Sequence, residues 1–119
     1  MSALCDRWRP AFAAALDPRF FSPAHLDALI ETGAARLWPG EHAAMLTEVR
    51  TFPSGARAIH GLVAAGNLEE LRTRLIPAAE AWGRRQGCEY ALIESREGWA
   101  RAMRGAGYSP FQTSILKEL

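Results

Sequence analysis

The first third of the chain has apolar residues at helical spacing. Five of them recur at intervals of three and four residues and form one stripe: Leu4, Trp8, Ala11, Phe12 and Ala15. This stripe predicts a helix that ends at Asp17-Pro18, because the residue before a proline is disfavoured in the α region. Ser22-Pro23 predicts the start of a second helix, with serine as the N-cap, and Gly33 predicts its end. We therefore expect residues 1–33 to form a helical N-terminal part.

The middle of the chain changes to the two-residue period of β-strands. Residues 43–52 alternate between the two sides of a half-buried strand, and residues 57–65 are more uniformly apolar, as near the centre of a sheet. The short link between them, Pro53-Ser54-Gly55, predicts an antiparallel hairpin. Residues 34–38 are a further short strand candidate, ended by Pro39-Gly40.

A helical period returns after Gly66-Asn67. The predicted stripe consists of Leu68, Leu71, Leu75, Ala79 and Trp82. Asn67 is the expected N-cap and Gly87 the expected end, while Pro77 predicts a kink or a break because it cannot donate a backbone hydrogen bond. Glu69 and Glu70 place negative charge in the first turn, which favours an ordinary capped helix over a phosphate site.

The last part is expected to contain a strand over residues 88–94, a short helix capped by Ser95 and a final strand over residues 108–119. A strand–helix–strand crossover makes its two strands parallel and is right-handed. The whole pattern predicts an α+β fold in a single domain, residues 1–119. Residues 34–119 form a mixed, mostly antiparallel sheet with a parallel central pair, and helices cover both faces.

Composition and charge exclude several classes of function. A chain of 119 residues with 49% hydrophobic and 23% charged residues is an ordinary globular domain. Its net charge of +1 does not indicate a nucleic-acid or membrane surface, and no apolar run approaches the ~20 residues that span a bilayer. Cys5 and Cys88 lie far apart, which argues against a disulfide scaffold and for the cytoplasm.

Motifs for metal or nucleophilic chemistry are scarce. His25, His42 and His60 have no metal-ligand spacing with one another or with the cysteines, so structural or surface roles are favoured and no metal site is expected. No serine or cysteine lies in a nucleophile elbow, and the glycine fingerprints of nucleotide-binding loops are absent.

The order of elements resembles the GNAT superfamily of N-acetyltransferases over residues 28–119. The segment that carries the resemblance is GCEYALIESREGWARAMRGAGY, residues 87–108. More narrowly, Trp82, Gly87-Cys88 and Arg96-Glu97-Gly98-Trp99 are similar to the divergent GNAT-like proteins of tailed phages, prophages and gene transfer agents.

The resemblance implies transfer of an acetyl group from acetyl-CoA to an amine. The cofactor would lie where residues 59–65 and 90–94 splay apart, which implies binding at Leu62, Val63, Ala64, Gly66 and Asn67. The sequence departs from the family here, because this loop has one glycine, no preceding arginine or glutamine, and too few residues to wrap a diphosphate in backbone amides.

The catalytic residues depart from the family as well. The tyrosine that protonates the leaving thiolate in many members would fall on Met103, which has no proton to give. Tyr108 remains a nearby candidate acid, and Glu48 or Glu94 is the candidate base that activates the amine.

Three hypotheses remain open at this point, and enzymatic activity is among the questions they leave undecided. The first is an acyl-CoA-dependent N-acyltransferase. The second is a non-catalytic structural or assembly component of a phage-like particle. Its apolar N-terminal residues, Trp8, Phe12, Phe20 and Phe21, would either cover the domain's own core or contact a protein partner or a second copy. The third is a different small α+β binding domain.

Overall fold

The computed structural model describes residues 3–95 and 98–119, with side chains from Asp6 onward. Arg96 and Glu97, which belong to the phage-type motif, lie outside the described residues. Within the described ranges, no helix combines the length and the apolar character that crossing a bilayer demands.

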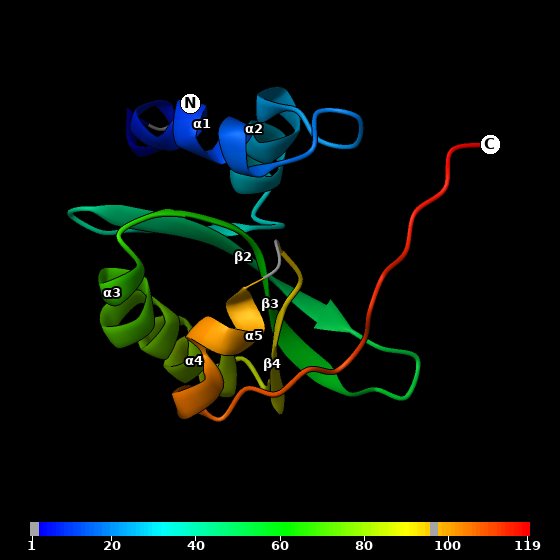
Figure 1. Ribbon diagram of the computed structural model, residues 1–119. Coiled ribbons are helices and arrows are strands. Elements are labelled where there is room, and N and C mark those ends of the chain that lie inside the picture. Colours follow the sequence, from blue (N-terminus) through cyan, green and yellow to red (C-terminus); the bar gives the residue numbers. More distant parts are fainter. Residues whose placement is uncertain (1–2, 96–97) are drawn as a thin grey trace.

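A mixed sheet forms the centre of the molecule (Figure 1). Its strands are β1 (Arg36–Pro39), β2 (Ala43–Thr51), β3 (Arg57–Gly66) and β4 (Tyr90–Ile93), and they lie side by side in that order. The pairs β1–β2 and β2–β3 are antiparallel, whereas β3 and β4 are parallel. The predicted mixed, mostly antiparallel sheet is therefore confirmed.

Two N-terminal helices cover one face of the sheet (Figure 1). They are α1 (Ala3–Ala15) and α2 (Pro23–Glu31), and the side chain of Ser22 caps α2 as predicted by accepting from the amide of His25. Their apolar side chains pack on the sheet in one cluster with Trp8, Phe12, Leu26, Ala44, Leu46 and Val63. Trp8 and Phe12 therefore cover the domain's own core, and Phe20 and Phe21 remain exposed.

The other face is covered by a continuous helical segment from Leu68 to Arg85. It consists of α3 (Leu68–Glu70), a π-helical turn η1 (Leu71–Leu75) and α4 (Ile76–Arg85). Pro77 is the second residue of α4, directly after the π turn, in which the amide of Ile76 reaches back to the carbonyl of Leu71. The irregularity expected at Pro77 is thus a widened turn, and the helix continues through it.

The strands β3 and β4 separate partway along their length. Pairing joins Ala58–Gly61 to Tyr90–Ile93, and β3 then continues to Gly66 without β4 beside it. A bulge in the β2–β3 ladder, where Leu46 faces Val63 but Thr47 faces Gly61, leaves Leu62 as the extra residue just where the separation begins. The predicted splay between the two parallel strands is present.

Gly66 makes the change of direction from β3 to the helix. Its φ is 99°, and a Cβ at this position would lie 2.3 Å from the carbonyl oxygen of His42. Both the backbone angle and the contact with the neighbouring loop require glycine here. The strand therefore ends at this residue, and Asn67 caps the helix, as the sequence predicts.

Two expectations for the C-terminal part are wrong. The short helix α5 (Trp99–Ala102) is preceded by Gly98 as its N-cap, not by Ser95, and is followed by a 3₁₀ turn η2 (Arg104–Ala106). Residues 108–119 do not form the predicted strand. This segment is held away from β4 at both ends, because Tyr108 bonds to Glu80 and Glu118 bonds to Arg19, so it has no neighbour with which to form a ladder.

Candidate active site

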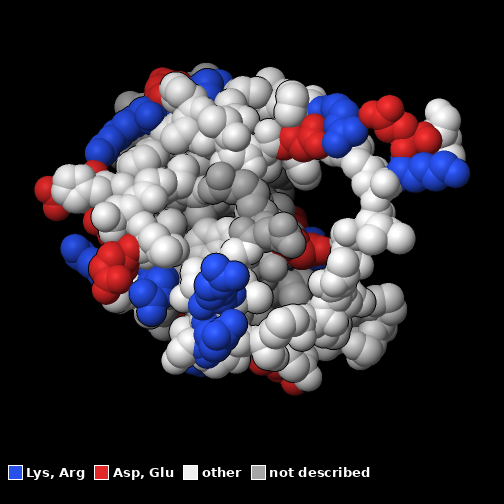
Figure 2. All heavy atoms as spheres, viewed as in Figure 1, with Lys and Arg blue, Asp and Glu red and all other residues white. Residues whose placement is uncertain are grey.

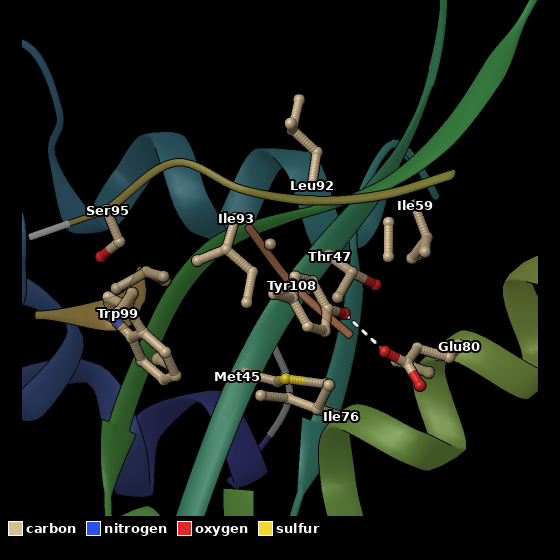
Figure 3. A pocket seen from close by; sticks show the side chains of 15 residues that line it. Met45, Thr47, Ile59, Ile76, Glu80, Leu92, Ile93, Ser95, Trp99 and Tyr108 are labelled. Atoms are coloured by element: carbon tan, nitrogen blue, oxygen red, sulfur yellow. Dashed lines mark hydrogen bonds between the residues drawn. The ribbon is translucent and has the colours of Figure 1, made fainter. Parts of the chain in front are cut away.

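Two adjoining cavities follow β3 on the side of the sheet that carries α4. The outer cavity, of about 320 Å³, lies at the start of the helix and is lined by Ala64, Ala65, Gly66, Leu68, Leu71, Gly98, Trp99 and Ala102. The inner cavity, of about 40 Å³, lies deeper between β3, β4 and α4 (Figure 3). Both contact Ala64 and Trp99, so they form one groove along the part of β3 that β4 has left.

The outer end of this groove meets the first turn of the helix. The Asn67 side chain accepts from the amide of Glu70 at 2.8 Å, and the amide of Asn67 donates to the His42 carbonyl at 2.9 Å. The amides of Leu68 and Glu69 precede the first intrahelical hydrogen bonds. The carboxylate of Glu70 accepts from the amide of His42 at 3.0 Å. This negative charge is therefore hydrogen-bonded to the link between β1 and β2.

The groove suits the acyl and pantetheine parts of acetyl-CoA better than its diphosphate. Its inner walls are apolar, and the separated length of β3 offers backbone groups to an extended amide chain. Within the described residues, no lysine or arginine lines either cavity. A diphosphate at the outer end would therefore rely on backbone amides at the start of the helix.

A polar cluster lies on the opposite face of the sheet. His60 is buried, with 3% of its surface exposed, and its Nδ1 is 2.8 Å from Oε2 of Glu48 while its Nε2 is 2.8 Å from Oε1 of Glu94. The guanidinium of Arg50 lies 2.9 Å from Oε1 of Glu94 and 3.5 Å from Oε2 of Glu48. The two carboxylates predicted as candidate bases are thus brought together by a histidine that sequence reasoning placed in a structural or surface role.

The register of the strands explains how this cluster forms. Glu48 faces His60 across the β2–β3 hairpin, and His60 faces Leu92 in β4, so Glu94 follows on the same side two residues later. In Figure 3, Leu92 points away from the cavity that Ile93 lines. In the sequence, the one available sign of this cluster was a histidine within an apolar strand. Which side chains contact that histidine follows only from the pairing register of the strands.

Glu94 is the more exposed of the two carboxylates in the cluster. It comes directly after β4, where the two parallel strands part, and half of its side chain is exposed compared with 28% for Glu48. His60 and Arg50 both contact its Oε1. These contacts orient the carboxylate at the end of the strand and leave half of the side chain open to solvent. Within the described residues, no group of histidine, cysteine and acidic side chains is arranged to hold a metal ion.

Tyr108 lies on the other side of the sheet from these carboxylates. Its hydroxyl points to Glu80 and donates to Oε2 at 2.5 Å (Figure 3). Burial, together with this hydrogen bond, raises the pKa of Tyr108 above its ordinary value. Met103, the position at which the resemblance would place the acid, is buried in the core. The structure therefore brings Glu48 and Glu94 together but does not join Tyr108 to them.

Replacement of Tyr108 by phenylalanine is expected to change how stability depends on pH. Because the pKa is raised in the folded state above the unfolded value of about 10, this tyrosine contributes stability below pH ~10 that is lost as the pH rises further. The free energy of unfolding of the wild type should fall above pH ~10, and that of Tyr108→Phe should fall less steeply. Urea titrations from pH 7 to 11 measure this, with Tyr90→Phe, on an exposed side chain, as the control. Equal slopes for all three proteins would contradict the prediction.

Comparisons with known proteins bear on the fold. A scan against protein-family models finds no match, and neither does a search of the curated proteins. Among solved structures, the ribosomal-protein-alanine N-acetyltransferase of Brucella melitensis biovar Abortus 2308 matches with a TM-score of 0.67 at 10% identity, over 97% of this chain and 93% of that one. Glucosamine-6-phosphate N-acetyltransferase from Arabidopsis thaliana matches with a TM-score of 0.67 at 10% identity, over 98% and 94%.

A third structure was determined with a ligand. It is a predicted acetyltransferase with acetyl-CoA from Clostridium acetobutylicum, which matches with a TM-score of 0.65 at 7% identity, over 98% of this chain and 86% of that one. These structures give no support to a phage-particle setting. At such low identity the likeness establishes the arrangement of the elements, and this chain accordingly has the fold of the GNAT acetyltransferases.

Proposed function

We propose that this protein is an N-acyltransferase that transfers the acetyl group of acetyl-CoA to an amine. The observation that carries the proposal is the parting of β3 and β4 after Gly61 and Ile93, with a groove on one side of the gap and Glu94 at its inner end. The likeness to acetyltransferase structures, one of them determined with acetyl-CoA, supports the same assignment.

The cofactor would bind along the separated part of β3. Val63 and Ala64 line the inner groove, and Gly66 lies at the outer cavity beside the Asn67 cap. Leu62 packs against the α1–α2 core, so only its backbone is available on this path. Acetyl-CoA supplies an activated thioester, and the apolar groove excludes water from it.

The residues of the opposite face would prepare the acceptor amine. Glu94 takes a proton from the ammonium form of the acceptor, directly or through a water molecule, while His60 and Arg50 hold the carboxylate in position. The neutral nitrogen then forms a bond to the carbonyl carbon, the carbon–sulfur bond breaks, and the second nitrogen proton passes through water to the thiolate. Because Tyr108 already donates its proton to Glu80, it is not the acid in this scheme.

Binding of acetyl-CoA is tested by two alanine-to-glutamate variants of α5. Ala102 lines the outer cavity, whereas Ala100 on the same helix is exposed and does not. If the dissociation constant is about 10 μM, about 1 mM acetyl-CoA should stabilise the folded wild type by about 2.7 kcal/mol and raise the Tm by about 10 °C. Ala102→Glu should abolish most of this shift because its charge repels the diphosphate, and Ala100→Glu should keep it.

Differential scanning fluorimetry with and without acetyl-CoA gives the readout. No shift in the wild type at several millimolar acetyl-CoA would remove the proposed function. An equal shift in both variants would move the cofactor away from the outer cavity.

The phage-type alternative stays a prediction with its own test. It rests on the resemblance of the segment around Trp82, Gly87-Cys88 and Trp99. Co-purification of the chain with phage-like particles would favour a structural or assembly role, and its absence from purified particles would count against that role.

A further inference from the structure

The inner cavity of the groove continues beyond the point where β3 and β4 part. Its lining includes Ala64 in the separated part of β3, and also Ile59 and Ala91, which face each other where the two strands are still paired. The proposed function puts the thioester of the donor at the gap after Gly61 and Ile93. The cavity therefore extends past the reacting carbonyl, on the side of the sheet that carries α4.

This extension exists because three elements contribute small residues to its walls. Gly61 comes from β3, Ala79 from α4 and Ala91 from β4. One turn further along α4, Gly83 lies so close to β3 that a Cβ on it would be 3.0 Å from the Cβ of Ile59. The helix and the strand touch there, whereas the small residues before that contact leave a space. Because protein interiors are otherwise closely packed, such a space is suited to part of a ligand.

The walls of the inner cavity favour an uncharged, apolar chain. Most of its lining is aliphatic, and two of its polar side chains already bond to the protein. The hydroxyl of Thr47 accepts from the indole of Trp38 at 2.9 Å, and the hydroxyl of Tyr108 donates to Glu80 (Figure 3). The carboxylate of Glu80 on the same wall would repel a negatively charged acyl group.

The size of the cavity sets the length of the chain that it can hold. A water-sized group occupies about 10–15 Å³. The inner cavity, of about 40 Å³, therefore holds about three such groups. An acetyl group has a single carbon beyond its carbonyl and would leave most of this space empty, whereas a butyryl group has three.

We propose that the inner cavity binds the acyl chain of the donor and that this protein prefers an unbranched, uncharged acyl group of about four carbons, as in butyryl-CoA, over acetyl. The proposal rests on the proposed acyl transfer and keeps its bond changes, because the same carbon–sulfur bond breaks and the amine receives a longer acyl group. The described charged side chains on the face drawn in Figure 2 are scattered in small groups of both signs. Selection among acyl groups therefore depends on the cavity and not on surface charge.

Isothermal titration of the wild type with four thioesters, in the absence of an acceptor amine, tests the proposal. Each methylene that moves from water into an apolar site improves affinity about four-fold, so butyryl-CoA should bind about 15-fold more tightly than acetyl-CoA. Hexanoyl-CoA should bind no more tightly than butyryl-CoA, because its chain is longer than the cavity. Succinyl-CoA should bind no more tightly than acetyl-CoA, because its carboxylate meets Glu80.

Variants that fill the cavity should remove the preference for butyryl-CoA. Ala79→Val adds two carbons to the wall and should bring the ratio of the two affinities to about one. Ala78→Val makes the same change at an exposed neighbour on α4 and should keep the ratio at about 15. Gly61→Ala adds one carbon, whose nearest neighbours would be 3.9 Å away, so the fold accepts it and the ratio should fall to about four. Circular dichroism verifies that each variant is folded.

The possible failures of this proposal and of the proposed function differ. If butyryl-CoA binds no more tightly than acetyl-CoA, the acyl-chain cavity is wrong and the proposed acyl transfer stands. If none of the four thioesters binds, both are wrong. A preference that Ala79→Val and Gly61→Ala leave unchanged, or a further gain with hexanoyl-CoA, means that the chain lies outside the inner cavity and also overturns the proposal.

Discussion

Replacing Glu94 with glutamine is expected to lower kcat for acyl transfer by about 10²–10⁴-fold, the contribution of a positioned general base. The amide keeps the size of the side chain and can still accept from His60 and Arg50, but it cannot take a proton from the amine. The measurement is thiol release from acetyl-CoA in the presence of small primary amines that the wild type acylates. The KM for acetyl-CoA should stay within a few-fold, because the carboxylate lies on the face opposite the cofactor groove.

The matched control is Glu89→Gln. Glu89 is an exposed glutamate directly before β4, so the same change of charge occurs at the other end of the same strand. It should leave kcat within about two-fold, as exposed substitutions away from a site do. If Glu94→Gln retains the wild-type kcat, the base lies elsewhere, and Glu48→Gln becomes the next variant to measure.

The sheet separates the two halves of the proposed chemistry. The α4 face carries the groove for the acyl donor, and the α1–α2 face carries the cluster of Glu48, Arg50, His60 and Glu94. The gap after Gly61 and Ile93 is where donor and acceptor would meet, because the ladder that closes the sheet elsewhere is missing there. Under the proposed function the shortness of β4 matters, since a longer strand would close the passage.

Local pattern predicted the elements whose signals are themselves local. The helical stripes, the hairpin, the caps Ser22 and Asn67 and the turn at Gly66 all follow from neighbouring residues, and the structure contains them. The wrong strand over residues 108–119 has the opposite cause. A strand exists only beside a partner, and the contacts of Tyr108 and Glu118 keep this segment from β4.

The candidate site was predicted in part for the same reason. Glu48 and Glu94 were found by residue type, but their connection through His60 depends on the register of three strands, which the sequence does not display. Tyr108 was a candidate only because it is a tyrosine near Met103, the position at which the resemblance places the acid. The path of the chain places it against Glu80 on the other face, and no spacing rule contains that information.

Phe12→Ala is expected to destabilise the fold by about 3–5 kcal/mol, the usual cost of truncating a large buried aromatic residue. Phe12 has no exposed surface and lies among Trp8, Leu26, Leu46 and Val63, where α1 meets the sheet. Removal of its ring leaves a cavity that the β-sheet on one side and two helices on the other cannot close. Against a typical total of about 5–15 kcal/mol, such a loss is a substantial share of the folded state's stability.

Urea denaturation followed by circular dichroism measures this change, with Phe20→Ala as the matched control. Phe20 is 58% exposed in the link after α1, so its truncation should alter the free energy of unfolding by no more than about 0.5 kcal/mol. If Phe12→Ala were as mild as the control, α1 would not be part of the cooperative core. The N-terminal helices would then be free to leave the sheet and to offer Trp8 and Phe12 to a partner, which is the interaction that their burial here excludes.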